Sequence, residues 1–149
     1  MPAPDIAIRP CRREEAAAVL ELWRRAQAFP SATDTLENLQ RLCREPGAGF
    51  LVATDGDRIV GSVIGGWDGW RGNIYRLAVA PEHRRRGLAA ALVEAAERWL
   101  IERGARRIAA IVEGKNPAGI GFWDSLRRNG YENEPGVLRY VKNVTSHGK

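Results

Sequence analysis

The sequence is poor in the residues that most often bind metals or form redox centres. It has two cysteines, Cys11 and Cys43, and two histidines, His83 and His147, among 149 residues. The cysteines lie far apart and match no metal or redox motif, so we expect two free thiols in or near the core. Two scattered histidines are too few for a metal site. We therefore expect no metal cofactor.

Long hydrophobic runs are also absent. No stretch approaches the roughly 20 apolar residues that a transmembrane helix needs, and the first five residues lack the charged and apolar regions of a signal peptide. We expect a cytoplasmic protein with no membrane partner. The hydrophobic content of 44% supports a proper core, and the length predicts a single domain over residues 1–149.

Lysine is scarce, with three residues, while arginine is abundant and the net charge is +5. Many arginines occur as scattered adjacent pairs, and most of these pairs fall beside glutamate in predicted helices, which favours solvated faces over a nucleic-acid-binding stripe. These pairs are Arg12-Arg13, Arg24-Arg25, Arg106-Arg107 and Arg127-Arg128. We expect no nucleic-acid partner, whereas the basic balance suits an anionic cofactor.

The most informative stretch runs from Tyr75 to Leu92. Tyr75, Leu77 and Val79 alternate with other residues as in a strand, which would place their side chains on one face. Pro81 ends the strand because it has no N–H group for a ladder. A basic turn follows at 84–87, and apolar residues then recur at helical spacing.

A strand that leads through a basic, glycine-containing turn into a helix can bind a phosphate. The first helical turn has unpaired N–H groups and lies at the positive end of the helix dipole. Gly87 and Ala89 give an anion room to approach, and Arg84, Arg85 and Arg86 add positive charge. A solvated basic turn that only joins the two elements is the alternative, and spacing alone leaves both open.

The rest of the chain alternates strand and helix patterns. Strands are predicted at 5–9, 49–54, 58–65, 107–113 and 136–144. Helices are predicted at 14–27, after a cap at Thr33 or Asp34, at 87–103, and after a cap at Asn116 with Pro117 in first position. The order strand–helix–strand around 87–103 predicts a parallel pair of strands. A glycine-rich loop with two tryptophans is predicted at 65–72.

The segment Arg84-x-x-Gly87-x-Ala89 resembles the [Q/R]-x-x-G-x-[G/A] motif of the GCN5-related N-acetyltransferase (GNAT) superfamily. The resemblance covers nearly the whole chain, and 61–72 is similar to a stretch of the small bacterial YpeA-type acetyltransferases. It implies an α/β fold with a mixed central sheet of about six to seven strands and about four helices. In that fold a pair of parallel central strands splays apart. Small enzymes of this kind are commonly homodimers.

The resemblance also implies a reaction and a cofactor, acetyl-CoA. The acetyl group would pass to a primary amine by direct attack, and the amine would belong to a small molecule, an amino acid, or a peptide or protein. The N–H of Val79 would stabilise the oxyanion. The cofactor-binding residues carried over are Leu77, Ala78, Val79, Arg84, Arg85, Arg86, Gly87, Leu88, Ala89, Ala90, Asn116, Phe122 and Trp123.

One residue departs from the family pattern. Trp123 occupies the place of a tyrosine that often protonates the leaving thiolate, and an indole N–H has no practical acidity. A module that binds acetyl-CoA as a regulatory ligand without turnover therefore remains an alternative. Ile111 stands where ribosomal-protein N-terminal acetyltransferases have a glutamate, which argues against that subfamily.

The catalytic base and the acceptor site have only candidates. Tyr75, Asp68 and Glu113 are candidate bases, because the attacking amine must lose a proton. Each also has a structural interpretation: packing at the core edge for Tyr75, turn formation for Asp68, and simple solvation for Glu113. Trp67, Asp68 and Trp70 would form a wall of the acceptor site or merely a turn with aromatic residues at the core edge.

Overall fold

The structure, a computed structural model, describes residues 6–28 and 30–144 of the chain. It forms two compact units, Met1–Ile111 and Val112–Lys149, which are described separately. The single domain expected over 1–149 stays a prediction. In the described residues no helix is both long and apolar enough to cross a membrane.

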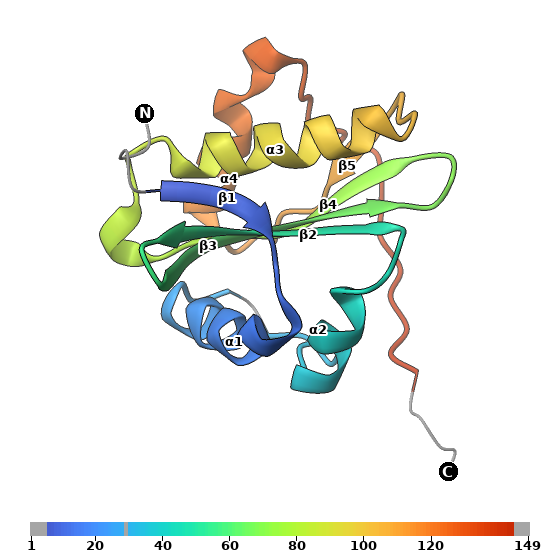
Figure 1. Ribbon diagram of the computed structural model, residues 1–149. Coiled ribbons are helices and arrows are strands. Elements are labelled where there is room, and N and C mark those ends of the chain that lie inside the picture. Colours follow the sequence, from blue (N-terminus) through green and yellow to red (C-terminus); the bar gives the residue numbers. More distant parts are fainter. Residues whose placement is uncertain (1–5, 29, 145–149) are drawn as a thin grey trace. The chain divides into compact units, whose positions relative to one another are not determined.

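A mixed five-stranded sheet forms the first unit's centre (Figure 1). Its strands lie in the order of the chain: β1 (Ile6–Pro10), β2 (Ala48–Asp55), β3 (Arg58–Trp67), β4 (Gly72–Val79) and β5 (Ile108–Ala110). The pairs from β1 to β4 are antiparallel, and β4 pairs with β5 in parallel. The mixed α/β architecture is confirmed, and the parallel pair lies where the sequence predicted it.

The expected number of six to seven strands is wrong, because the sheet has five over residues 6–28 and 30–144. The predicted strand at 136–144 is not a strand, and β5 covers only three residues of the one predicted at 107–113. Apolar residues in 136–144 fall on both parities, so no single face is apolar. A strand also needs a partner for its ladder, which a local pattern cannot supply.

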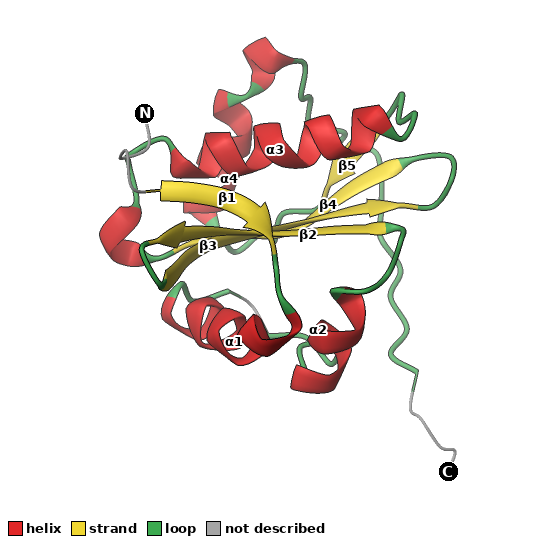
Figure 2. Ribbon diagram, in the orientation of Figure 1, coloured by secondary structure: helices red, strands yellow, loops and turns green. Residues whose placement is uncertain are grey.

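Helices cover both faces of this sheet (Figure 2). α1 (Ala16–Arg25) and α2 (Leu36–Leu42) lie on one face, and α3 (Leu88–Glu102) lies on the other. The second unit contains α4 (Pro117–Ser125). The described residues thus hold four α-helices, as expected, together with three short 3₁₀ helices.

Two helix starts differ from the sequence prediction. A 3₁₀ turn, Arg13–Glu15, precedes α1, so the α-helix begins later than residue 14. α2 is capped by Thr35, whose hydroxyl accepts the N–H of Asn38 at 3.1 Å, instead of by Thr33 or Asp34. Asp34 is already engaged, since its carboxylate binds the side chain of Arg76 and the N–H of Ser31.

Glycines let α3 approach the sheet closely. A Cβ on Gly49 would lie 2.5 Å from the ring of Trp99, and one on Gly72 would lie 3.0 Å from Leu100. Any larger residue at Gly49 or Gly72 would therefore push α3 away from the core.

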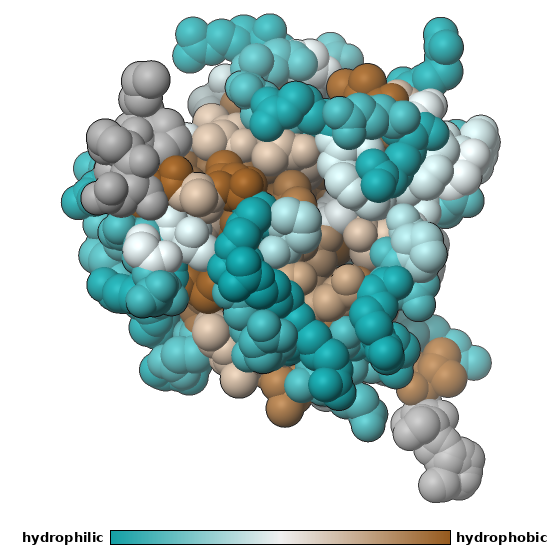
Figure 3. All heavy atoms as spheres, in the orientation of Figure 1, coloured by the Kyte–Doolittle hydropathy of each residue, from teal (hydrophilic) through white to brown (hydrophobic). Residues whose placement is uncertain are grey.

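Hydrophobic residues visible on the outside appear as patches between hydrophilic ones (Figure 3).

Candidate active site

The turn between β4 and α3 has the backbone of an anion-binding loop. A 3₁₀ turn, Pro81–His83, follows the strand, and the chain then reaches α3 through Arg85 and Gly87, with φ of 63° and 78°. Left-handed residues within such a turn direct successive N–H groups to one side. Gly87 is the N-cap of α3 and none of the described side chains caps the helix, so its first N–H groups remain available to a ligand.

The three arginines of this turn are not equivalent. Arg84 donates a hydrogen bond from Nη2 to the carbonyl of Ala26, 3.1 Å away at the end of α1. Arg85 and Arg86 are exposed, and no ion pair engages them within the described residues. Arg84 therefore anchors the turn, while Arg85 and Arg86 are free to meet a phosphate.

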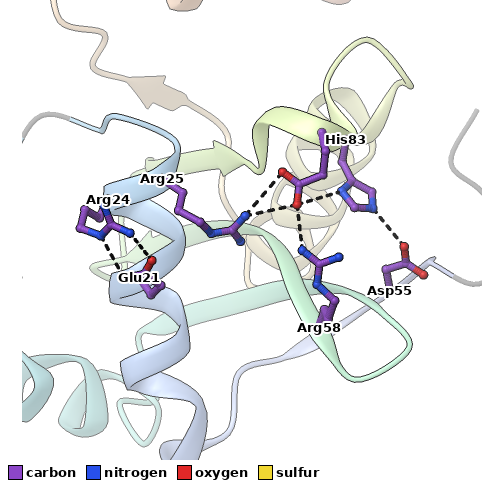
Figure 4. Close-up of polar contacts among 7 residues, drawn as sticks. Glu21, Arg24, Arg25, Asp55, Arg58 and His83 are labelled. Carbon is purple, nitrogen blue, oxygen red and sulfur yellow. Dashed lines mark hydrogen bonds and ion pairs between the residues drawn. The ribbon is translucent and has the colours of Figure 1, made fainter.

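A cluster of charged residues holds this turn against the rest of the first unit (Figure 4). Arg25 and Arg58 lie 3.2 Å and 2.9 Å from Oε2 of Glu82, which belongs to the turn. The buried His83 contacts Oδ2 of Asp55 through Nε2 at 3.0 Å. Its Nδ1 is 4.0 Å from Glu82, beyond hydrogen-bond distance. α1 and the β2–β3 hairpin thus both support the turn.

A β-bulge interrupts β4 just before the turn. Ser62 and Ile64 of β3 face Ala78 and Tyr75, so two residues of β4, Arg76 and Leu77, oppose one residue of β3. Arg76 has a φ of 52°, which is unusual for a residue with a side chain. Such a bend must be supported by the surrounding structure.

Side chains from α1 and the loop before α2 supply that support. The hydroxyl of Ser62 donates to the carbonyl of Arg76 and accepts the indole N–H of Trp23, both at 2.9 Å. The guanidinium of Arg76 lies 5.0 Å from the Trp23 ring centroid and pairs with Asp34 at 2.5 Å. This network was not predicted, since no local pattern links Ser62, Trp23 and Asp34.

Within the described part of the first unit, no strand pairs with the second edge of β4 beyond Ile74. β5 pairs with β4 only over Gly72, Asn73 and Ile74. The N–H of Ala80 binds the carbonyl of Val60 in β3 at 2.8 Å. Because N–H groups alternate in direction along a strand, the N–H of Val79 points away from β3, towards the edge that β5 has left.

The bulge also changes the face of Tyr75. Val79 pairs with Gly61, and a Cβ on Gly61 would point towards Leu92 of α3, so Val79 faces α3. The ring of Tyr75, in contrast, lies beside Gly66. Gly65, the neighbour of Gly66, faces α3, so Gly66 and Tyr75 face α1 and α2. The prediction that Tyr75 and Val79 share a face was wrong, because a bulge shifts the alternation.

The residues expected at the acceptor site lie at the other end of β4. Asp68 and Trp70 belong to the tight turn between β3 and β4, and Trp67 ends β3. Oδ1 of Asp68 accepts the N–H groups of Trp70 and Arg71, both at 2.8 Å. These hydrogen bonds lower the pKa of Asp68, and the one from Arg71 has the larger effect. Asp68 is therefore a weak base. The expected acceptor role of the three residues stays a prediction.

The second unit holds the remaining predicted site residues. Asn116 caps α4 by accepting the N–H of Gly119 at 3.0 Å, as expected. Trp123 packs edge to face on Phe122 and on Tyr131, with ring centroids 5.4 Å and 5.1 Å apart. Glu113 lies just before α4. Roles for these residues at the cofactor stay predictions.

Comparison with known proteins identifies the class of this chain. The model of the acetyltransferase (GNAT) family matches residues 16–128. "Acetyltransferase SG1711" of Sodalis glossinidius is 37% identical over 137 residues, which is 92% of this chain and 94% of the relative. "Acetyltransferase ECA0875" of Pectobacterium atrosepticum is 40% identical over 119 residues, covering 80% and 84%.

A solved structure shares the fold. The PaiA N-acetyltransferase of Thermoplasma acidophilum, solved with coenzyme A, matches with a TM-score of 0.75 and 19% identity over 87% of this chain and 91% of that one. The chain belongs to the acetyltransferase (GNAT) family. The expectation of an acyltransferase enzyme is thereby confirmed. No cluster of metal-ligating side chains occurs among the residues that the structure describes.

Proposed function

We propose that this enzyme transfers the acetyl group of acetyl-CoA to a primary amine by direct attack. The turn between β4 and α3 is the observation that carries the proposal. It combines left-handed Arg85 and Gly87, an uncapped helix start and two unpaired arginines. That combination suits a pyrophosphate, which carries negative charge and accepts several hydrogen bonds.

The free edge of β4 gives the remainder of the donor a place to lie. The amide groups of pantetheine can pair with exposed backbone as an added strand would. Leu77, Ala78 and Val79 are the residues we assign to this contact. The N–H of Val79, which points away from β3, is suited to stabilise the oxyanion of the tetrahedral intermediate.

For the base we favour Tyr75 over Asp68. Tyr75 lies on β4 next to the bulge with its side chain about half exposed. Asp68 has a lowered pKa and lies beyond the start of β4, an eight-residue strand that spans about 26 Å at roughly 3.3 Å per residue. Proton removal from the ammonium through water at Tyr75 is the arrangement that these positions support.

The test is Gly87→Trp, which places a large side chain at the start of α3. Calorimetry with acetyl-CoA should show at least about a tenfold loss of affinity, because the pyrophosphate loses its N–H contacts. Gly56→Trp is the matched control: Gly56 is also left-handed, with φ of 61° and open space around it, but lies in the β2–β3 turn. Normal binding by the Gly87 variant would refute our assignment of the turn.

Turnover separates the enzyme from a regulatory module. Release of free thiol from acetyl-CoA should be measured with a panel of amines, amino acids and peptides. Turnover on any acceptor supports the proposed reaction. Tight binding without turnover on the whole panel would favour the module, and Trp123→Tyr would then test whether the missing phenol is the cause.

A further inference from the structure

A basic hollow with one aromatic wall lies at the opposite end of β4 from the cofactor turn. The end of β3 and the β3–β4 turn form one wall, and the connection from α3 to β5 forms the other. Its lining residues are Trp67, Gly69, Trp70, Arg71, Arg103, Gly104, Arg106 and Arg107. The hollow has a volume of about 540 Å³, within the usual range for small-ligand sites.

The charge of this hollow is of one sign. Four arginines line it, and among the residues that the structure describes no acidic side chain does. Asp68, next to it in sequence, directs Oδ1 to the backbone N–H groups of its own turn. Arg71, Arg103 and Arg106 around one concave surface concentrate positive potential, which attracts anions.

Two of the arginines are held in place by stacking. The guanidinium of Arg103 lies 3.6 Å from the Trp99 ring centroid and donates a hydrogen bond to the Trp99 carbonyl at 3.0 Å. The guanidinium of Arg71 lies 4.0 Å from the ring centroid of Trp70. A stacked guanidinium can still offer its remaining N–H groups to a planar anion, and little side-chain entropy is lost on binding.

The tryptophans add an aromatic surface to the charge. Trp70 is 69% exposed although it belongs to a turn that Asp68 fixes. Trp67 is fixed as well. Its backbone N–H donates to the carbonyl of Gly47 at 2.7 Å, and a Cβ added to Gly104 would lie 3.9 Å from its ring. A large, rigid, exposed ring among arginines is suited to stack on a planar ligand.

We propose that this hollow is a second ligand site, which binds a nucleotide by stacking its base on Trp70 while Arg71 and Arg103 bind its phosphate. Stacking platforms beside basic side chains are how proteins bind single nucleotide units without reading sequence. An acidic peptide would use the arginines but leave Trp70 without a role. The proposal departs from the sequence-based expectation of no nucleic-acid partner, since folding brings together arginines from separate segments.

The experiment measures binding of a fluorescein-labelled hexauridylate to the full chain by anisotropy, and of AMP by calorimetry. Trp70→Ala and Arg71→Ala should each weaken hexauridylate binding by about tenfold, as expected for loss of one stacked base or one phosphate contact. Trp70→Phe should retain most of the affinity. Arg24→Ala, which removes another exposed arginine, on α1, is the matched control and should change the affinity for hexauridylate less than twofold.

Measuring the affinity for coenzyme A distinguishes this site from the cofactor turn. Trp70→Ala and Arg71→Ala should leave it unchanged within twofold, because neither residue belongs to that turn. Binding of AMP but not of hexauridylate would identify free nucleotide as the source, and the reverse would identify single-stranded RNA. No binding of either probe, or equal binding by Trp70→Ala and the native chain, overturns the proposal. Preferential binding of a polyglutamate peptide overturns it in favour of an acidic protein partner.

Discussion

At the scale of single residues, the ion pair of Arg9 and Glu15 offers the clearest test of stability. Two N–H groups of Arg9 meet the Glu15 carboxylate at 2.8 and 2.6 Å, and the N–H of Arg12 meets it at 2.9 Å. The hydrogen bonds from Arg9 lower the pKa of Glu15, and the backbone N–H of Arg12 adds to this effect. Partial burial of Glu15 opposes it. The pair joins β1 to the turn before α1.

Glu15→Gln should lower the free energy of unfolding at pH 7 by about 1.5 kcal/mol, since charge-assisted hydrogen bonds are lost. A carboxyl whose pKa is lower in the folded state stabilises the fold above its unfolded pKa of about 4.3 and loses this effect as the pH falls further. Urea unfolding at pH 7 and pH 3 should show the difference shrinking at pH 3. Glu21→Gln, in an exposed pair with Arg24, should change neither midpoint measurably. A difference that persists at pH 3 would contradict the electrostatic explanation.

At the scale of elements, the cofactor turn depends on contacts with α1 and the β2–β3 hairpin. Glu82→Gln weakens the contacts of the Glu82 side chain with Arg25 and Arg58, and it leaves the other residues of the turn unchanged. We expect the KM for acetyl-CoA to rise about threefold, with kcat nearly constant, because exposed ion pairs contribute little each. Steady-state kinetics measure both values, and Glu94→Gln on α3 is the control. A fall in kcat at constant KM would exclude a role in cofactor binding.

The elements around the turn show which features a sequence can predict. The stop at Pro81, the strand before it, and the cap of α4 at Asn116 follow from local rules, and all three occur in the structure. The bulge in β4 could not be predicted, because Asp34, which holds Arg76, lies 42 residues away. The same cause reversed the predicted face of Tyr75.

At the scale of the whole molecule, arginines that are distant in sequence come together in space. The pair Arg106-Arg107 falls between the helix predicted at 87–103 and the strand predicted at 107–113, and in the structure it follows α3 and lines a hollow with Arg71. Charge patterns along the chain predict a face only within one helix. Strand pairing brings the β3–β4 turn close to the end of α3, which a local pattern cannot predict. One end of β4 therefore carries the cofactor turn, and the other carries the basic hollow.

Hydrogen exchange across the full chain tests this division. Coenzyme A at about 100 times its dissociation constant stabilises the bound form by about 2.7 kcal/mol, so contacted amides should exchange up to about 100-fold more slowly. We expect protection in peptides covering 77–79 and 84–90, where the free strand edge and the uncapped helix start lie. Segment 48–55, which is β2 in the interior of the sheet, is the internal reference. Protection confined to 67–72, with 84–90 unchanged, would place the cofactor in the basic hollow and contradict the assignment of the turn. Protection that saturates first at 84–90, and reaches 67–72 only at higher concentration, would show two sites of different affinity on one enzyme.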